Sequence, residues 1–157
     1  MLARHPVLRE HVRPLIQMKV RPDQEDLVST NAKTLAQAAY ETGSYVWGLW
    51  DGETLVGLIA MIHPGEYPWD DRAVPEPAND MSAAYLWHLM IGAEFQGNGY
   101  GGAALAEALA QTRAWGCPRL TAHVAVAPHS NLAFYERFGF RSTGKIEDGE
   151  LVIAIDL

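Results

Sequence analysis

The chain has 157 residues, and its 12 Lys and Arg against 19 Asp and Glu give a formal net charge of −7. Its 48% hydrophobic and 20% charged residues are typical of one folded domain over residues 1–157, and the acidic balance argues against nucleic acid as a partner. The single cysteine, Cys117, excludes an internal disulfide, and the longest apolar run, residues 55–62, is too short to cross a membrane, so we expect a cytoplasmic protein without membrane contact.

The first third of the chain predicts a strand, two helices and a hairpin. Residues 12–20 alternate roughly as a strand does, and the polar segment that opens at residues 21–23 favours a short helix. A second helix is predicted from residue 31, with Thr30 or Asn31 as its N-cap and Gly43 as its stop. Two apolar runs then flank Asp51-Gly52, a strong hairpin signal, so residues 45–50 and 54–62 are expected to pair antiparallel.

The remaining elements predict a mixed sheet with a crossover connection. Residues 64–77 form a proline-rich segment that is expected to be a long loop, and the almost wholly apolar residues 83–91 predict a strand at the centre of the sheet. A helix over residues 103–115, a strand over 120–127, a short helix over 131–138 and strands over 140–144 and 151–157 complete the chain. This order indicates an α/β domain.

The most informative segment is the glycine-rich turn of residues 96–102, between the central strand and the next helix. Glycines allow a tight turn close to a ligand, and amides at a helix N-terminus attract phosphates. The segment alone could also be a sharp turn without a ligand. Gly97, Gly99 and Gly102 match the spacing of a dinucleotide site, but the acidic residue expected about 20 positions later is missing. A phosphate or pyrophosphate site is therefore favoured, and a dinucleotide site is not.

Gln96, Gly99 and Gly101 resemble the Q/R-x-x-G-x-G/A signature of the GNAT superfamily, which contains acetyl-CoA-dependent N-acetyltransferases. Upstream, residues 89–91 are similar to the family's L-x-V strand end, and an N-x-x-x-Y motif at residues 131–135 precedes Gly-Phe. The resemblance covers nearly the whole chain. It implies the GNAT acyl-CoA N-acyltransferase fold, a mixed and mostly antiparallel sheet of about seven strands flanked by four helices.

The resemblance also implies a coenzyme site and no metal. The pyrophosphate of acetyl-CoA would rest on the amides of residues 96–101, and its pantetheine arm would lie along a strand that a bulge separates from its neighbour. Asn131, which also fits an N-cap, would touch the coenzyme. The expected coenzyme-binding residues are Leu89, Met90, Ile91, Gln96, Gly97, Asn98, Gly99, Tyr100, Gly101, Gly102 and Asn131.

Two residues are candidates for proton transfer. By resemblance, Tyr135 is the general acid that protonates the leaving thiolate, although it would also fit as a core aromatic residue. His88 has a side chain suited to accepting a proton, but alternation turns it away from the face of Trp87 and Leu89, so a core histidine is the stronger interpretation. Ordered water or a carboxylate from the first helices, such as Glu25, remains an alternative base. The other histidines show no metal-binding spacing and receive no role: His5, His11, His63, His123 and His129.

The acceptor is expected to be a primary amine. Residues 24–38 and the ending at 143–152 are similar to the bacterial diamine and polyamine acetyltransferase branch, and the net charge favours a small cationic amine. The carboxylates considered for its attraction are Glu25, Asp26, Glu41, Asp70, Asp71, Glu76 and Asp80, and the tryptophans considered for its pocket are Trp47, Trp50, Trp69 and Trp87. A homodimer is expected by family analogy. The alternative function is a non-catalytic acyl-CoA sensor or interaction module, because the central strand lacks a carboxylate.

Overall fold

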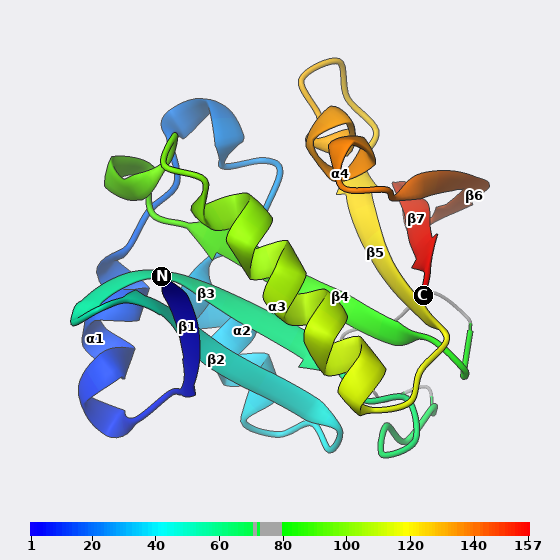
Figure 1. Ribbon diagram of the computed structural model, residues 1–157, viewed down its shortest axis with the longest axis horizontal. Helices are drawn as coiled ribbons and strands as arrows, with labels where there is room; N and C mark the ends of the chain where they lie inside the picture. The colour runs from blue at the N-terminus through cyan, green and yellow to red at the C-terminus, as the bar shows by residue number, and fades with distance from the viewer. Residues whose placement is uncertain (71, 73–79) are drawn as a thin grey trace.

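One seven-stranded sheet organises the protein, and helices cover both of its faces in the computed structural model (Figure 1). The structure describes residues 1–70, 72 and 80–157. The strands are β1 (Leu2–Pro6), β2 (Ser44–Asp51), β3 (Thr54–Ile62), β4 (Ala84–Ile91), β5 (Arg119–Ala125), β6 (Arg141–Glu147) and β7 (Glu150–Asp156). The helices are α1 (Arg9–Gln17), α2 (Asn31–Ala38), α3 (Tyr100–Ala114) and α4 (Leu132–Arg137), with 3-10 turns η1 (Pro22–Gln24) and η2 (Ala93–Phe95).

The strand order is β1-β2-β3-β4-β5-β7-β6, and β4 with β5 is the one parallel pair within it. The predicted mixed, mostly antiparallel sheet is therefore confirmed, with β4 at its centre. The hairpin of β2 and β3 around Asp51 and Gly52 is confirmed too, because the register joins Asp51 to Thr54. In Figure 1, α3 crosses one face of the sheet, whereas α1 and α2 lie behind the other face.

The principal core lies between the sheet and α3. Its fully buried side chains include Leu49, Ile59, Leu105, Leu120, Phe140 and Ile153. Burying each large apolar side chain stabilises the fold by about 1.5–3 kcal/mol. This core holds β4 and β5 in fixed positions at one end of the sheet, and the opening described below forms at their other end.

The N-terminal prediction was wrong. Residues 12–20 were expected to form a strand, but α1 occupies most of this segment, and the first strand is β1, paired as an edge strand to β2. Val12, Leu15 and Ile16 follow helical spacing, and only Leu15 of the three is fully buried. An edge strand buries few side chains, so β1, where Leu2 is the buried residue, carries little apolar signal.

In place of the short helix predicted after residues 21–23 there is only the 3-10 turn η1, and the other predicted elements are present with shifted ends. Helix α3 begins at Tyr100, three residues before the predicted start, because Gly99 adopts a left-handed conformation at the N-cap with φ of +81°. Helix α2 begins after Thr30, whose side chain accepts a hydrogen bond from the Lys33 backbone N–H. The loop predicted over residues 64–77 lies partly outside the described residues.

The predicted separation of the central strands is present. Strands β4 and β5 pair over only three positions, from Ala84 with Leu120 to Leu86 with Ala122, and then diverge (Figure 1). In the pairing of β3 with β4, Ala60 lies opposite His88 and the next residue, Met61, lies opposite Leu86. Trp87 is therefore the extra residue of a β-bulge in β4. Beyond Leu86, the edge of β4 that faces β5 therefore lacks a partner strand.

Candidate active site

Two clefts meet where β4 and β5 diverge. The first has a volume of about 770 Å³ and is bordered by the glycine-rich turn, η1 and α4, whereas the second has about 420 Å³ and lies over β4, α2 and the β6–β7 hairpin. Both clefts are lined by the same five residues at their junction: Leu27, Val28, Leu89, Asn131 and Tyr135. A ligand that fills the first cleft can therefore contact a ligand in the second across the opening in the sheet.

The glycine-rich turn forms one end of the first cleft. Gly97 and Gly99 both have φ of +81°, and a Cβ atom at either position would meet open space, so these two residues are needed for the backbone path and not for packing. The turn leads directly into α3, a helix of 15 residues. The backbone N–H groups of its first turn have no partners within the helix, and the macrodipole favours an anion at this end.

Gly101 and Gly102 serve a different purpose, namely the approach of α4. A Cβ atom on Gly101 would lie 3.0 Å from the ring of Phe134, and one on Gly102 would lie 2.6 Å from the ring of Phe138. Both phenyl rings line the first cleft. Glycine at these two positions thus allows α4, which carries Tyr135, to pack closely against the start of α3.

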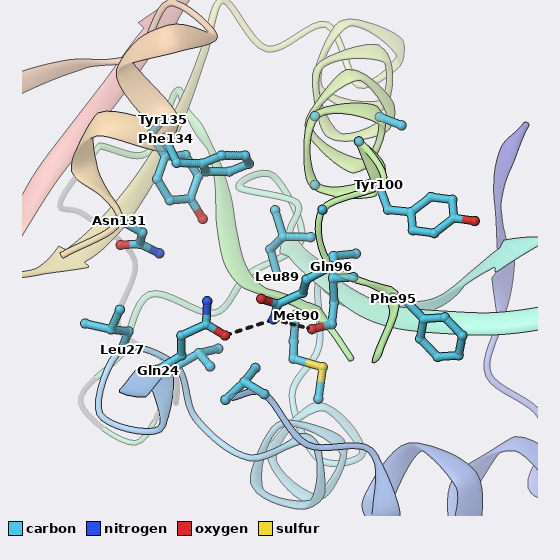
Figure 2. Close-up of a pocket in the computed structure, with 18 of the residues that line it drawn as sticks. Gln24, Leu27, Leu89, Met90, Phe95, Gln96, Tyr100, Asn131, Phe134 and Tyr135 are labelled. Atoms are coloured by element: carbon cyan, nitrogen blue, oxygen red, sulfur yellow. Dashed lines mark hydrogen bonds between the residues drawn. The ribbon is translucent and has the colours of Figure 1, made fainter. Parts of the chain in front are cut away.

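Polar side chains fix the shape of the turn (Figure 2). Gln96 Nε2 donates to the Ile91 carbonyl at 3.0 Å and to Gln24 Oε1 at 2.8 Å, which ties η1 to the end of β4. Asn98 Nδ2 donates to the Phe95 carbonyl at 3.0 Å. These two side chains are therefore engaged within the protein, and the part of residues 96–98 left for a ligand is mainly backbone.

Leu89, Met90 and Ile91, expected to lie along the coenzyme, all line the first cleft. Tyr100 lines it as well, but its side chain turns away in Figure 2 and its hydroxyl donates to Asp51. Only the backbone of Tyr100 is thus available to a ligand. Its side chain instead anchors the start of α3 to the β2–β3 hairpin.

Tyr135 stands at the junction with its hydroxyl pointing into the space beside Leu89 (Figure 2). Its ring packs edge-on against Phe134 and Phe140, with centroid distances of 5.2 and 5.4 Å, and 7% of the residue is exposed. Burial raises the pKa of the phenol to about 12, so the hydroxyl stays protonated at neutral pH. Among the described residues, no hydrogen-bond partner holds it. A buried, protonated hydroxyl is thus available to a ligand.

Asn131 occupies the N-cap position of α4 without making a side-chain cap hydrogen bond. Its Oδ1 atom is buried and has no partner among the described residues, although the residue lines both clefts. A buried amide oxygen without a partner is energetically costly, and a ligand that donates a hydrogen bond there would remove that cost.

His88 lies beneath α2 and is among the residues that line the second cleft, but it is not one of the junction residues. Its Nδ1 atom is 3.0 Å from Thr34 Oγ1, its Nε2 atom is 2.9 Å from Asn31 Oδ1, and 3% of the residue is exposed. Burial lowers its pKa to about 4, so the imidazole is neutral above that pH. Both ring nitrogens are engaged, which is the geometry of a core histidine and leaves no nitrogen for a substrate proton.

The carboxylates expected to attract the acceptor lie elsewhere. Within the described part of the chain, none of Glu25, Asp26, Glu41, Asp70 and Asp80 lines either of the two clefts. Asp71 and Glu76 lie outside the described residues. The second cleft is bordered instead by Asp148 and Glu150 of the β6–β7 hairpin. Of the four tryptophans considered, Trp87 of the bulge lines this cleft.

Several side chains that received no role from the sequence also lie at the clefts. Tyr85 and His123 line the second cleft, and the guanidinium-bearing residues Arg21 and Arg137 line the first. Nothing in the local pattern of the sequence marks these four, because they reach the clefts from separate elements. Among the described residues, no group of three or more His, Cys, Asp or Glu side chains could hold a metal ion, and no helix is long and apolar enough to span a membrane.

Comparison with known proteins agrees with this architecture. The sequence model of the Acetyltransferase (GNAT) family matches residues 10–140, which is most of the chain. The chain therefore belongs to the GNAT family of acetyltransferases and is an acyltransferase. No curated protein sequence gives a match.

Solved structures show the same fold at low sequence identity. An acetyltransferase from Thermus thermophilus has a TM-score of 0.69 at 20% identity, covering 100% of this chain and 97% of that one. The PaiA N-acetyltransferase of Thermoplasma acidophilum, in complex with coenzyme A, has a TM-score of 0.69 at 15% identity, covering 100% of this chain and 99% of that one. A GNAT family acetyltransferase of Elizabethkingia anophelis with acetyl-CoA bound has a TM-score of 0.65 at 15% identity, covering 99% of this chain and 98% of that one.

Proposed function

We propose that this protein transfers the acetyl group of acetyl-CoA directly to a primary amine. The observation that carries the proposal is the position of Tyr135, whose buried hydroxyl faces the junction of two clefts in a GNAT fold. One cleft is suited to the coenzyme and the other to the acceptor. Transfer requires the two ligands to touch, and the gap between β4 and β5 provides the place.

The first cleft supports coenzyme binding. Its free helix N-terminus favours the pyrophosphate, and Arg21 and Arg137 on its border can pair with further phosphate oxygens. The unpaired edge of β4 at Leu89 to Ile91 offers backbone groups to the amides of the pantetheine arm. Two of the structures with the same fold are complexes with acetyl-CoA or coenzyme A, which supports the same donor for this chain.

The reaction requires one nucleophilic displacement and two proton movements. The neutral amine attacks the thioester carbonyl, the carbon–sulfur bond breaks, and the electron pair leaves on the coenzyme sulfur. Tyr135 donates its hydroxyl proton to that thiolate, and its raised pKa ensures that the proton is present at the start. The nitrogen, which is cationic after the attack, loses one proton as the amide forms, and through solvent that proton replaces the one that Tyr135 gave up. Asn131 Oδ1, which lacks a partner, can accept a hydrogen bond from the coenzyme arm.

The second cleft supports a cationic acceptor. Asp148 and Glu150 border it, against a single cation, Lys33, among its described lining residues. Two carboxylates at the mouth attract an ammonium group, and the net charge of −7 adds long-range attraction. We therefore propose a small di- or polyamine as the acceptor class, in agreement with the resemblance of the N-terminal helices to polyamine acetyltransferases.

The test is release of free coenzyme A from acetyl-CoA across a panel of spermidine, putrescine, amino acids, aminoglycosides and N-terminal peptides, at two salt concentrations. We expect turnover with amines, the highest kcat/KM with polyamines, and a decrease at 1 M salt, where the screening length is ~3 Å. Efficient acetylation of uncharged amines with inert polyamines would contradict the acceptor class alone. Coenzyme binding without turnover of any amine would instead favour the acyl-CoA sensor.

A further inference from the structure

Three polar side chains at or behind the wall of the second cleft are not used by the mechanism above, and two of them, Tyr85 and His123, line the cleft. The Tyr85 hydroxyl lies 3.0 Å from His123 Nδ1, and the two rings are 5.1 Å apart between centroids. On the other side of the imidazole, His123 Nε2 lies 3.6 Å from Glu147 Oε2. The three residues come from β4, β5 and β6 and form a continuous chain of polar atoms that starts at the cleft.

Two of these three side chains are largely buried. Tyr85 is 5% exposed, and the side chain of His123 is 11% exposed. His123 Nε2 is buried and makes no hydrogen bond to the described residues, since Glu147 is beyond hydrogen-bond range. A buried ring N–H that faces a carboxylate makes a stronger, charge-assisted contact once the imidazole becomes charged.

We propose that Tyr85, His123 and Glu147 form a proton relay that deprotonates the acceptor amine before it attacks the thioester. The proposal rests on the N-acetyltransferase function argued above and supplies its missing base. Tyr85 is the member that touches the substrate, whereas His123 and Glu147 act through it. Tyr85 in the second cleft and Tyr135 at the junction then perform opposite tasks, since Tyr85 accepts a proton on the amine side and Tyr135 donates one on the thiolate side.

The step balances without any further reactant. A proton leaves the ammonium nitrogen for the Tyr85 oxygen as the Tyr85 hydroxyl proton passes to His123 Nδ1, so the amine regains its lone pair and Tyr85 stays neutral. His123, which begins with its proton on Nε2, becomes an imidazolium that faces Glu147. The proton then leaves to solvent, because the Glu147 side chain is 31% exposed.

The charges around the relay favour this coupled transfer over a free tyrosinate. Burial raises the pKa of the Tyr85 phenol, and the neighbouring Glu147, Glu150, Tyr135 and Tyr67 raise it further. A phenol in this environment cannot hold a negative charge, so it can accept a proton only while it passes its own onward.

The test compares pH profiles of kcat/KM for the wild type, His123→Gln and Tyr85→Phe, with His5→Gln on β1 as the control. At pH 7, each relay variant should lose roughly 10²-fold. Without the relay only amine that is already neutral reacts, so log kcat/KM of the variants should rise by one per pH unit. The loss of kcat/KM relative to the wild type should therefore shrink as the pH approaches ~10, the ordinary pKa of an alkylammonium group. His5→Gln should follow the wild type.

A second set of measurements separates the relay from a structural role. The double variant Tyr85→Phe/His123→Gln should lose no more than either single variant, because the residues act as one unit. Calorimetry should give each variant the wild-type Kd for acetyl-CoA, which also shows that it is folded. A loss that stays constant from pH 7 to pH 9.5 would overturn the relay. Failure of the wild type to acetylate any amine would overturn the proposed function instead.

Discussion

Replacing His88 with glutamine separates a core histidine from a catalytic one. The imidazole is held between Thr34 and Asn31 under α2, and burial lowers its pKa to about 4 from an ordinary value of 6.5. Between those two values, the unfolded chain binds a proton at His88 that the folded protein does not. The free energy of unfolding therefore increases with pH across this window, and the stabilisation is lost as the pH falls from about 6.5 towards 4.

The size of the effect follows from the difference of about 2.5 units between the ordinary pKa of histidine and the pKa of His88 in the folded protein. At 1.36 kcal/mol per unit, protonation of His88 would cost the folded state about 3.4 kcal/mol in full. Between pH 7.5 and pH 4.5 the portion that develops is about 2.5 kcal/mol. This is a large part of the ~5–15 kcal/mol that stabilises a typical domain.

The assay is urea denaturation of the wild type and of His88→Gln at both pH values. The variant loses part of the hydrogen-bond network and should be less stable at pH 7.5, but it lacks the titration. Its deficit should therefore shrink by about 2.5 kcal/mol at pH 4.5, while the titration of all other groups cancels in the difference. A deficit that does not change with pH would refute the buried, neutral histidine. Loss of kcat in a variant that is folded at pH 7.5 would show that His88 takes part in catalysis.

Three further predictions concern the clefts. Gly99→Asp should weaken acetyl-CoA binding roughly 10²-fold relative to Gly99→Asn, as measured by calorimetry. Aspartate and asparagine both tolerate the left-handed backbone, so the two variants differ mainly in charge. One negative charge about 5 Å from a phosphate costs about 3 kcal/mol at an effective dielectric of 20. Equal affinities would remove the turn from the coenzyme site. Tyr135→Phe should lower kcat by roughly 10²–10⁴-fold in steady-state assays with Kd for acetyl-CoA unchanged, since the ring packing remains, and an unaffected kcat would exclude it as the acid. Glu150→Gln should raise KM for a polyamine about threefold at low salt and should not change it at 1 M salt. The control Glu10→Gln, at an exposed position, should leave KM unchanged. A change in KM that does not depend on salt would argue against attraction by charge.

The sequence predicted most of the fold because its strongest patterns are local. The hairpin around Asp51-Gly52, the apolar central strand and the helix after the glycine-rich turn each depend on a few neighbouring residues, and all three are present. The N-terminal error has the opposite cause. Helix α1 is short and buries only Leu15 fully, and β1 pairs on one side, so neither segment carries the periodicity that separates helix from strand.

The candidate site likewise has one part that local sequence patterns predict and another that only the fold brings together. The turn over residues 96–102 could be found from the sequence because its four glycines lie within six residues and precede a helix. Tyr85 and His123 could not be found as a pair, since they meet only because the β4–β5 register places Tyr85 opposite Thr121, two residues before His123. Glu147 joins them through the β6–β7 hairpin, in which it pairs with Glu150.

Acetyl transfer itself is tested most directly with acetyl-CoA that carries a ¹³C-labelled acetyl group, incubated with the wild-type protein and the best amine of the panel. Mass spectrometry follows the label, and a thiol reagent follows free coenzyme A. We predict that the label appears on the amine nitrogen in equal amount to the coenzyme released, and that Tyr135→Phe slows both together. Label recovered only as free acetate, or retained on the coenzyme while the protein binds it, would contradict the assignment of this protein as an amine acetyltransferase.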